Sequence, residues 1–485
     1  MNRHFPVLHA FSLVLLVFAG AMVLPVAVSA WLGDGAERVY DEAVLITAVS
    51  ALLLWRATRR HRRDLRVRDG FLLVSLVWLL LPAFAAIPFW LYLPAMSFTD
   101  AYFEAVSGLT TTGATVIEGL DALPYSINLW RAELQWLGGM GIIVLAVAIL
   151  PLLGVGGRQA YGAEASGPIK ETRLTPRMAH TARGLWTVYA VLAVACALGY
   201  VWAGMSWGDA VIHTFTTLSL GGFSSHDASF AFFDSPRAEW VAIVFMTLGG
   251  MNFATHFAAV RRGGLGIYRG DAEIRWYLIV MYASVLGVAF YLWQAQAYPD
   301  FATALRFAAF NVVSVATTTG YASTDYLLWP FFAPLWMLFL ASFVSCAGST
   351  GGGLKMMRAV ILFRQMTREV IRTVHPNAVR TVKLAGAPLP NRIVFAVLAF
   401  AFAFMVIIVS GTLLLVLSGL DVVTAFSAVV ACITSTGPGF GEVGPAGNFK
   451  SLTDFQTWLL SAVMLLGRLE IFTLLVVFSP AFWRK

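Results

Sequence analysis

Long apolar stretches, separated by short polar ones, occupy most of the chain. A helix that crosses a membrane needs roughly 20 predominantly apolar residues, and ten stretches are interpreted as spans. The first run, Phe5 to Leu32, is too long for the core of a signal peptide and lacks a clear cleavage site, so it is kept as a span. The predicted spans are residues 6–31, 40–56, 70–93, 130–152, 184–204, 238–260, 276–294, 332–364, 391–418 and 456–480.

Four further apolar runs are too short to cross: residues 99–111, 208–219, 302–317 and 421–434. Runs of this length are typical of re-entrant or buried helices. Each ends at a short segment of small residues that closes with a glycine. Each begins near residues that start helices, namely Ser97 or Thr99–Asp100, Trp207–Gly208–Asp209, Asp300, and Gly419–Leu420–Asp421.

The four small-residue segments resemble one another, and we call them the glycine segments. They are Thr110–Gly113, Ser219–Gly222, Thr317–Gly320 and Thr434–Gly437; the second lacks the threonines but keeps a hydroxyl first and a glycine last. The order span, short helix, glycine segment, span therefore occurs four times, and internal repeats of this kind mark an architecture. The predicted domains are two extra N-terminal spans in 1–69 and four repeats in 70–157, 158–269, 270–383 and 384–485.

Composition and charge place the chain in a membrane. Apolar residues make up 59% of the 485 residues and charged residues 12%, which leaves too much apolar surface for a water-soluble protein. The net charge of +7 does not indicate a nucleic-acid binder, because the basic residues cluster between spans at 56–69, 158–183, 261–275 and 355–392. Cytoplasmic loops carry the excess of Lys and Arg, so these clusters and both termini are predicted to be cytoplasmic.

The glycine segments have the chemistry of a site for a monovalent cation. Non-helical backbone at membrane depth must be buried in protein or line a water-filled cavity, and glycine lets the backbone turn its carbonyl oxygens inward. A ring of such oxygens replaces the hydration shell of an ion, and the C-terminal ends of the short helices add partial negative charge. No ring of Asp or Glu occurs in the segments, which argues against a divalent-cation filter. Helix capping or helix packing is the alternative role of such clusters.

Five motifs resemble the Trk/Ktr/HKT superfamily of potassium transporters, and the resemblance covers the whole chain. The motifs are FEAVSGLTTTGAT (103–115), LSLGGFSS (218–225), ATTTGYAS (316–323), GSTGGG (348–353) and GPGFGEVGP (437–445). The two extra N-terminal spans make the chain similar to the TrkH-type members of this superfamily rather than to its shorter members. The resemblance implies an all-α integral membrane protein with four span–pore-helix–span repeats around a pseudo-fourfold pore. It also implies potassium uptake across a bacterial inner membrane, a homodimer in the lipid bilayer, and a cytosolic TrkA-like ring that binds nucleotide.

The resemblance also implies the residues of an ion selectivity filter. In the family, glycine in all four filter loops accompanies a preference for potassium, and serine in the first accompanies sodium. The corresponding glycines are Gly113, Gly222, Gly320 and Gly437, so a potassium ion is expected to bind there and be transported. The ion ligands implied are the backbone carbonyls of Thr111, Thr112, Leu220, Gly221, Thr318, Thr319, Ser435 and Thr436.

Residues 346–353, CAGSTGGG, interrupt the predicted span 332–364, because closely spaced glycines break a helix. Such a break can form a loop across a conduction path or allow close helix packing. The resemblance favours an intramembrane gate built from Gly348, Ser349, Thr350, Gly351, Gly352 and Gly353. The basic run from Lys355 to Lys383 would then be placed to contact a partner, although positive-inside topology explains it equally well.

Arg468 lies at the corresponding place in the fourth repeat, within LLGRLEIF. An ionisable residue inside a span is a functional-site hypothesis, and here it is predicted to form a barrier to cations below the filter. A structural ion pair with a carboxylate is the alternative. Among other polar residues, Glu104 and His213 are expected to hydrogen-bond within the short-helix scaffold. Asp227 and Glu442 are expected on the outer surface, where they either attract cations or are simply solvated.

Other classes of function find less support. An intramembrane enzyme would need a Ser/His dyad, paired mid-span aspartates or HExxH on a span; none is found, and His256 has no partner at catalytic spacing. The loops are too short to form a soluble binding domain. Cys196, Cys346 and Cys432 lie in apolar runs, so neither a disulfide framework nor a zinc site is expected. A symporter that couples potassium to protons or sodium stays open as an alternative.

Overall fold

The computed structural model describes residues 4–61, 65–153, 176–262, 264, 266–384 and 387–484, and these are almost entirely helical. Two short strands, β1 (Lys383–Leu384) and β2 (Ala387–Pro388), pair in antiparallel orientation. The helices are α1 Phe5–Ala21, α2 Val23–Leu32, α3 Glu37–Thr58, α4 Val67–Ala85, α5 Ile87–Tyr92, α6 Phe98–Leu109, α7 Tyr125–Leu153, α9 Pro176–Trp202, α10 Trp207–Leu218, α11 Pro236–Gly249, α12 Phe253–Arg262, α13 Gly266–Gly270, α14 Ala272–Gln294, α15 Phe301–Ala316, α16 Phe332–Ala341, α17 Met356–Val374, α18 Asn391–Leu417, α19 Val422–Thr434, α20 Asp454–Arg468, α21 Phe472–Phe478 and α22 Pro480–Trp483. Short 3-10 turns follow the glycine segments at Leu120–Ala122, Ser229–Phe232, Tyr326–Leu328 and Gly441–Val443.

Several helices are long and apolar enough to cross a membrane. In the described part of the chain they are Phe5–Leu32, Arg68–Tyr92, Ala182–Trp202, Ala272–Gln294 and Asn391–Leu417, and two bent pairs, α11 with α12 and α20 with α21, raise the number to seven if each counts as one span. All seven coincide with predicted spans. At most 39% of the residues in the most apolar window of each of the five are buried, so most of their apolar side chains face outward. The protein is therefore a helical membrane protein.

Two of the predicted spans are sharply bent. Residues 238–260 form α11 and α12, bent by 91°, and residues 456–480 form α20 and α21, bent by 113°. At the first bend, the carbonyls of Gly249 and Gly250 accept hydrogen bonds from another loop of the chain instead of continuing the helix. At the second, Glu470 (φ 54°) and Ile471 (φ 46°) are left-handed, a conformation that cannot continue a right-handed helix.

The predicted interruption of the span 332–364 is present, because α16 ends at Ala341 and α17 begins only at Met356. The non-helical stretch is therefore residues 342–355, longer than the predicted 346–353, and we call it the break loop. Gly348, Gly353 and Lys355 have φ between 74° and 75°, a left-handed conformation that a right-handed helix does not contain. Helix α17 then extends to Val374, beyond the predicted end of the span.

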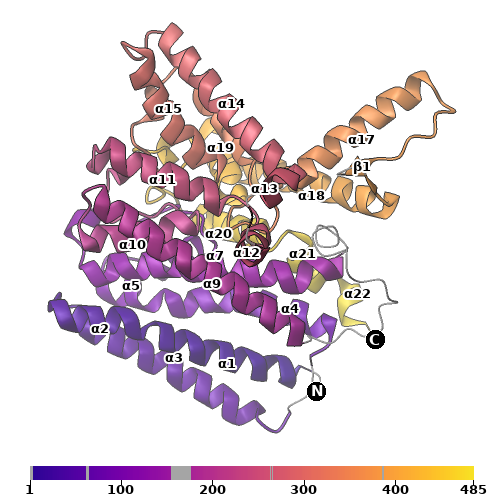
Figure 1. Ribbon diagram of the computed structural model, residues 1–485. Coiled ribbons are helices and arrows are strands. Elements are labelled where there is room, and N and C mark those ends of the chain that lie inside the picture. Colours follow the sequence, from indigo (N-terminus) through magenta and orange to yellow (C-terminus); the bar gives the residue numbers. More distant parts are fainter. Residues whose placement is uncertain are drawn as a thin grey trace.

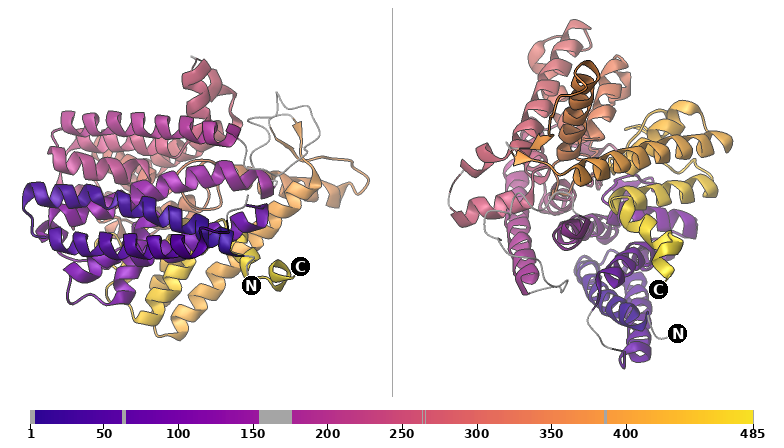
Figure 2. Two further views of the ribbon diagram at one scale, coloured as in Figure 1. Left: turned by 90° about the horizontal axis from the view of Figure 1, so that it is seen from below. Right: turned by 90° about the vertical axis from the view of Figure 1, so that its right-hand side faces the viewer.

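The helices form a bundle with a projecting arm. The N-terminal helices α1, α2 and α3 lie along one side of the bundle, and α14 and α15 lie at the opposite side (Figure 1). Helix α17 and the strand pair project from the end of the bundle at which both termini lie, as all the views show (Figures 1 and 2). The arm is thus continuous in sequence with the break loop.

The four short helices begin where the sequence predicts. A side-chain oxygen caps each N-terminus: Ser97 accepts from Asp100 N, Ser206 from Asp209 N, Asp300 from Thr303 N, and Asp421 from Val423 N and Thr424 N. Such residues satisfy backbone N–H groups that lack a partner within the helix. The C-terminal halves of α6, α10, α15 and α19 are buried, so all four point their carboxyl ends into the protein interior.

Candidate functional site

The four glycine segments share one backbone conformation. The second residue of each is left-handed, with φ of 53° at Thr111, 55° at Leu220, 66° at Thr318 and 58° at Ser435. The closing glycines have φ of 83°, 75°, 86° and 92° at Gly113, Gly222, Gly320 and Gly437. A left-handed non-glycine residue costs roughly 1–2 kcal/mol, so the surrounding packing must enforce this shape four times.

Backbone hydrogen bonds repeat in the same way. The N–H of the third residue donates to the carbonyl five residues earlier, at 2.9 Å for Thr112 and Gly221 and at 2.8 Å for Thr319 and Thr436. Each segment is thereby fixed to the last turn of its short helix. The likeness holds for the second segment too, although its side chains differ from those of the other three.

The segments meet one another in a closed cycle. A side chain added to Gly113 would collide with the carbonyl oxygen of Gly221, one added to Gly222 with that of Thr319, and one added to Gly320 with that of Thr436, all well inside 3.0 Å. A side chain on Gly437 would meet the carbonyl oxygen of Thr112 at 2.7 Å, which returns to the first segment. Each closing glycine thus leaves room for a carbonyl of the next segment. That carbonyl always belongs to the third residue of the segment. Four carbonyls, spaced far apart in sequence, are thereby linked in one closed cycle of contacts.

The break loop packs directly against this ring. Thr350 Oγ1 donates to Leu218 O at 2.9 Å, and Gly352 N donates to Thr318 Oγ1 at 2.8 Å. A side chain on Gly351 would lie 3.0 Å from Thr317 O, and one on Gly352 would collide with Thr434 O. The loop therefore contacts the carboxyl ends of α10, α15 and α19 and the segments that follow them. The residues predicted as a gate are brought together against the residues predicted as a filter.

Arg468, at the end of α20, also bonds to this loop. Its guanidinium donates to Thr350 O at 2.8 Å and to Gly138 O at 3.3 Å, and its side chain is buried. Gly138 itself packs against Leu109 O at the end of α6. No carboxylate of the described residues pairs with Arg468, so the expected alternative of an ion pair is not seen. Its partners are carbonyl oxygens of the break loop and of α7.

Two ionisable residues that no sequence motif singles out also hold the break loop. Glu273, buried at the start of α14, accepts from Ala347 N at 2.7 Å and from Met357 N at 3.1 Å, so one carboxylate joins the middle of the loop to the first turn of α17. Lys355 Nζ donates to Gly351 O, within the loop. Nearby, Arg358 of α17 pairs with Glu470, so Glu470 has a partner other than Arg468. Glu273 lies at the edge of a basic cluster in the sequence, and no local pattern links it to residues 347–357.

A buried ion pair supports the first segment from outside. Arg131 Nε donates to Glu104 Oε1 at 2.8 Å, and both side chains are at most 1% exposed. Glu104 also accepts from Thr115 Oγ1 and Val116 N at 3.0 Å, and Arg131 donates to Ser224 O at 2.9 Å, which joins the residues just after the first segment to those just after the second. The expectation that Glu104 serves the short-helix scaffold is confirmed. Arg131 was missed, although a basic residue inside an apolar span is a signal in itself.

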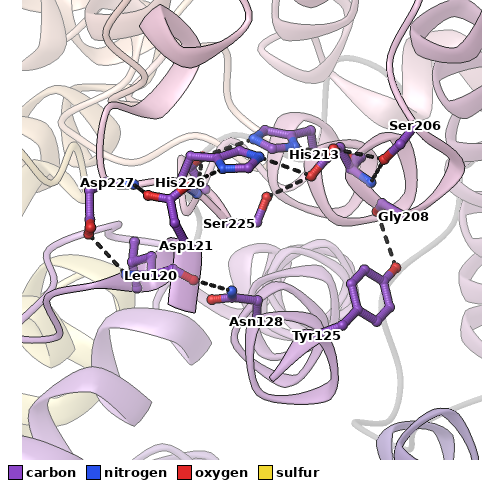
Figure 3. Close-up of polar contacts among 12 residues, drawn as sticks. Leu120, Asp121, Tyr125, Asn128, Ser206, Gly208, His213, Ser225, His226 and Asp227 are labelled. Carbon is purple, nitrogen blue, oxygen red and sulfur yellow. Dashed lines mark hydrogen bonds and ion pairs between the residues drawn. The ribbon is translucent and has the colours of Figure 1, made fainter. Parts of the chain in front are cut away.

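Polar residues gather just beyond the first and second segments, in the loops that follow them. His226 lies between two carboxylates, hydrogen-bonded to Asp121 and to Asp209 Oδ1, the latter at 3.2 Å. Figure 3 shows His226 beside His213, with Asp121 below His226 and Asp227 near Leu120. His213 bonds to Ser224 Oγ at 3.0 Å, as expected of a scaffold residue, and Asp227 accepts from Leu120 N at 3.1 Å. The cluster ties the two loops together at this face.

The cluster predicts a pH dependence of stability. Partial burial alone lowers the pKa of His226, but the hydrogen bonds and charges of Asp209 and Asp121 outweigh it and raise the pKa above its ordinary value of 6.5. Because the folded state binds the proton of His226 more tightly than the unfolded state, protonation stabilises the fold. This stabilisation is fully present below the pKa of the unfolded state and is lost as pH rises through the pKa of the folded state. His226→Gln is therefore expected to lower the thermal midpoint by roughly 1–2 °C at acid pH, with the difference shrinking at alkaline pH. His375→Gln, at an exposed histidine, is the control; an equal effect there would contradict the assignment.

Glu442 and His256 have hydrogen-bond partners outside the four glycine segments. Glu442 accepts from Ser451 Oγ at 2.8 Å at an exposed site, as expected of surface. His256 bonds to Tyr268 and to Leu248 O. The three cysteines, Cys196, Cys346 and Cys432, are buried and free.

Comparison with known proteins identifies the family. The family TrkH, described as a cation transport protein, matches residues 35–485. The chain belongs to the TrkH family. The resemblance drawn from the motifs is thereby confirmed, and so is the prediction that the protein is not an enzyme, because the TrkH family transports cations.

Relatives in the TrkH family match over nearly the whole chain. "Trk system potassium uptake protein TrkH" of Salmonella typhimurium is 45% identical over 475 residues, 98% of this chain and 98% of that protein. The TrkH of Halomonas elongata is 44% identical over 481 residues, 99% of each, and TrkG of Escherichia coli is 38% identical over 432 residues, 89% of this chain and 88% of that protein. The crystal structure of the potassium transporter TrkH from Vibrio parahaemolyticus superposes with a TM-score of 0.92 at 41% identity, covering 99% of this chain and 100% of that one.

Proposed function

We propose that this protein conducts potassium into the cell through the ring formed by its four glycine segments. The observation that carries the proposal is the closed cycle in which each of the four glycines packs against a carbonyl oxygen of the next segment. A ring of backbone carbonyls can replace the water around a monovalent cation. Relatives that match nearly the full length are named potassium uptake proteins, which supports potassium as the ion.

The proposed ion ligands are the carbonyls of the two residues before each glycine. They are those of Thr111, Thr112, Leu220, Gly221, Thr318, Thr319, Ser435 and Thr436. The carboxyl ends of α6, α10, α15 and α19 point into the interior beside them and contribute partial negative charge. This arrangement supports the division into four repeats, 70–157, 158–269, 270–383 and 384–485, around one pseudo-fourfold pore.

The break loop is the proposed gate. It packs against the ends of three short helices, and Arg468 links it to Gly138, beside the fourth. A path that leaves the ring on this side must displace the loop. The gate residues are Gly348 to Gly353 together with Arg468, whose buried positive charge would also oppose a cation.

Helix α17 is the proposed contact for a cytosolic partner, a TrkA-like ring that binds nucleotide. The helix begins one residue after the break loop, carries Arg364, Arg368 and Arg372, and projects beyond the bundle at the end where both termini lie (Figure 1). A partner that moves α17 would pull on the loop directly.

Phe363, Met366 and Val370 of α17 are more than half exposed, which supports a homodimer that covers them. Positive-inside loops support a bacterial inner-membrane orientation with both termini in the cytosol.

Ion flux into proteoliposomes that contain only this chain tests the proposal. Radioactive rubidium serves as tracer, with excess potassium, sodium, lithium or choline as competitor. We expect potassium, but not sodium, to block rubidium uptake. Equal block by both ions would contradict a potassium filter, and empty liposomes give the background.

Coupled transport is the alternative, and one observation favours it. Glu133 of α7 is buried, and its Oε2 has no hydrogen-bond partner among the described residues. A buried acid of this kind can carry a proton in a transporter. Rubidium accumulation against its gradient, driven by an imposed proton gradient, would favour a symporter, whereas passive equilibration would favour a channel-like pore.

A further inference from the structure

Three of the four glycine segments are tied internally by a pair of threonine hydroxyls. The first and third residues bond to each other in Thr110 with Thr112 (2.7 Å), Thr317 with Thr319 (2.8 Å) and Thr434 with Thr436 (2.8 Å). The second segment has Ser219 and Gly221 at these places, so the hydroxyl pair is missing. Its backbone nevertheless follows the other three. Another group must hold it there.

Gln135, on α7, occupies the place of the missing threonine. Its Nε2 donates to Gly221 O at 2.7 Å, and its Oε1 accepts from Phe223 N at 3.1 Å, so the amide bridges the two residues on either side of Gly222. The side chain is fully buried. A Cβ on Gly221 would collide with the Gln135 amide well inside 3.0 Å. The volume that a threonine side chain would fill therefore holds Gln135 instead.

The first segment provides an internal comparison. Gln135 and Met464 occupy corresponding positions, because each lies three residues before a glycine that packs against the end of a short helix. For Gln135 this glycine is Gly138, which packs against Leu109 O. For Met464 it is Gly467, which packs against Ile433 O. Met464 Sδ lies 3.8 Å from Thr110 Oγ1 of the first segment. At this position, the first segment, which has the threonine pair, is contacted by a methionine. The second segment, which lacks the pair, is contacted by a glutamine.

We propose that Gln135 is a positioning residue that determines the ion selectivity of the ring through the carbonyl of Gly221. This carbonyl is the one that packs against Gly113, so its direction affects two segments at once. Selectivity in such rings depends on the number and field strength of the carbonyl dipoles. One lone pair of the Gly221 carbonyl accepts from Gln135, and the second remains for an ion. The inference rests on the proposed function of the ring as a potassium filter.

The test measures block of rubidium uptake by potassium and by sodium in three variants. Gln135→Met removes both hydrogen bonds at similar volume and is expected to lower the potassium-over-sodium preference roughly tenfold, the scale of losing one to two buried hydrogen bonds. Gln135→Met combined with Gly221→Thr reproduces the surroundings of the first segment and is expected to regain most of the preference. Tyr125→Phe is the control, because it removes a part-buried hydrogen bond on the same helix, to Gly208 O at 3.1 Å (Figure 3), outside the segments.

The outcomes separate this inference from the function on which it rests. A wild-type protein without potassium preference would overturn the proposed function itself. A potassium-selective wild type with an equally selective Gln135→Met would overturn only the role of Gln135. An equal loss in Tyr125→Phe would also overturn it, because general loosening of α7 would then explain both. If Gln135→Met does not fold, Gln135→Asn, which is one methylene too short to bridge both groups, is measured against the same criteria.

Discussion

Gly113→Ser is expected to lower the preference for potassium over sodium by about tenfold or more, the largest change in selectivity that we expect from a single substitution. Gly113 has a φ of 83°, and a Cβ there would collide with Gly221 O. A serine must therefore push that carbonyl away and also adopt a left-handed conformation that costs roughly 1–2 kcal/mol. Both effects change the ring at the point where the first and second segments meet. Competition of potassium and sodium against rubidium uptake measures the result.

Gly119→Ser provides a matched control for this substitution. Gly119 lies six residues further along the same loop, with a φ of 72°, and a Cβ there would meet nothing within 4 Å. The two variants share the new side chain and the backbone strain but differ in the collision. Gly119→Ser is expected to keep the ion preference of the wild type. An unchanged preference in Gly113→Ser would contradict the role given to Gly113 in the ring.

Arg468→Ala is expected to raise the flux of rubidium about tenfold or more without changing the order of ion preference. The substitution removes the hydrogen bonds from Arg468 to Thr350 O and Gly138 O, and a hydrogen bond from a charged donor is worth roughly 1.5–3 kcal/mol. The break loop would then leave its place against the ring more often. Deletion of residues 348–353 is expected to act in the same direction. Initial rates of uptake at a fixed amount of folded protein give the measurement.

Arg468→Lys separates the two ways in which Arg468 can act. Lysine keeps the positive charge but lacks the guanidinium fork that reaches Thr350 and Gly138 together. If charge alone forms the barrier, flux stays low; if the hydrogen bonds hold the loop, flux rises as in Arg468→Ala. Arg306→Ala, which removes an arginine paired with Glu239 away from the loop, is the control and should leave the flux unchanged. Loss of ion preference in Arg468→Ala would assign Arg468 to the filter rather than to the gate.

Selectivity and gating are expected to be separable but not fully independent. Gly352 N donates to Thr318 Oγ1, so the break loop touches the third segment itself. Glu273 of α14 accepts from Ala347 N in the loop and from Met357 N in the first turn of α17, and α17 continues from the loop into the projecting arm (Figure 1). Force on the arm therefore reaches the ring through a short chain of bonded groups.

The local sequence determined the elements from which the site is built. Length and hydropathy located the long spans, since crossing lipid requires about 20 apolar residues. Ser97, Ser206, Asp300 and Asp421 fixed the starts of the four short helices, because capping depends on a few neighbouring residues. The glycine segments were recognisable because a left-handed turn favours glycine wherever it occurs. These features depend on contacts within a few residues along the chain.

Tertiary structure decided how those elements meet. The order of the ring, in which Gly113 faces Gly221 and Gly437 faces Thr112, depends on carbonyls far apart in the sequence. The bends in α11–α12 and α20–α21 arise because carbonyls leave their helix for distant partners or because two residues turn left-handed. Gln135 and Glu273 are ordinary polar residues in sequence and gain their roles only when Gly221 and Ala347 are packed beside them. Such pairings are fixed by the packing of whole helices, because no local preference of the chain distinguishes these side chains from others of their kind.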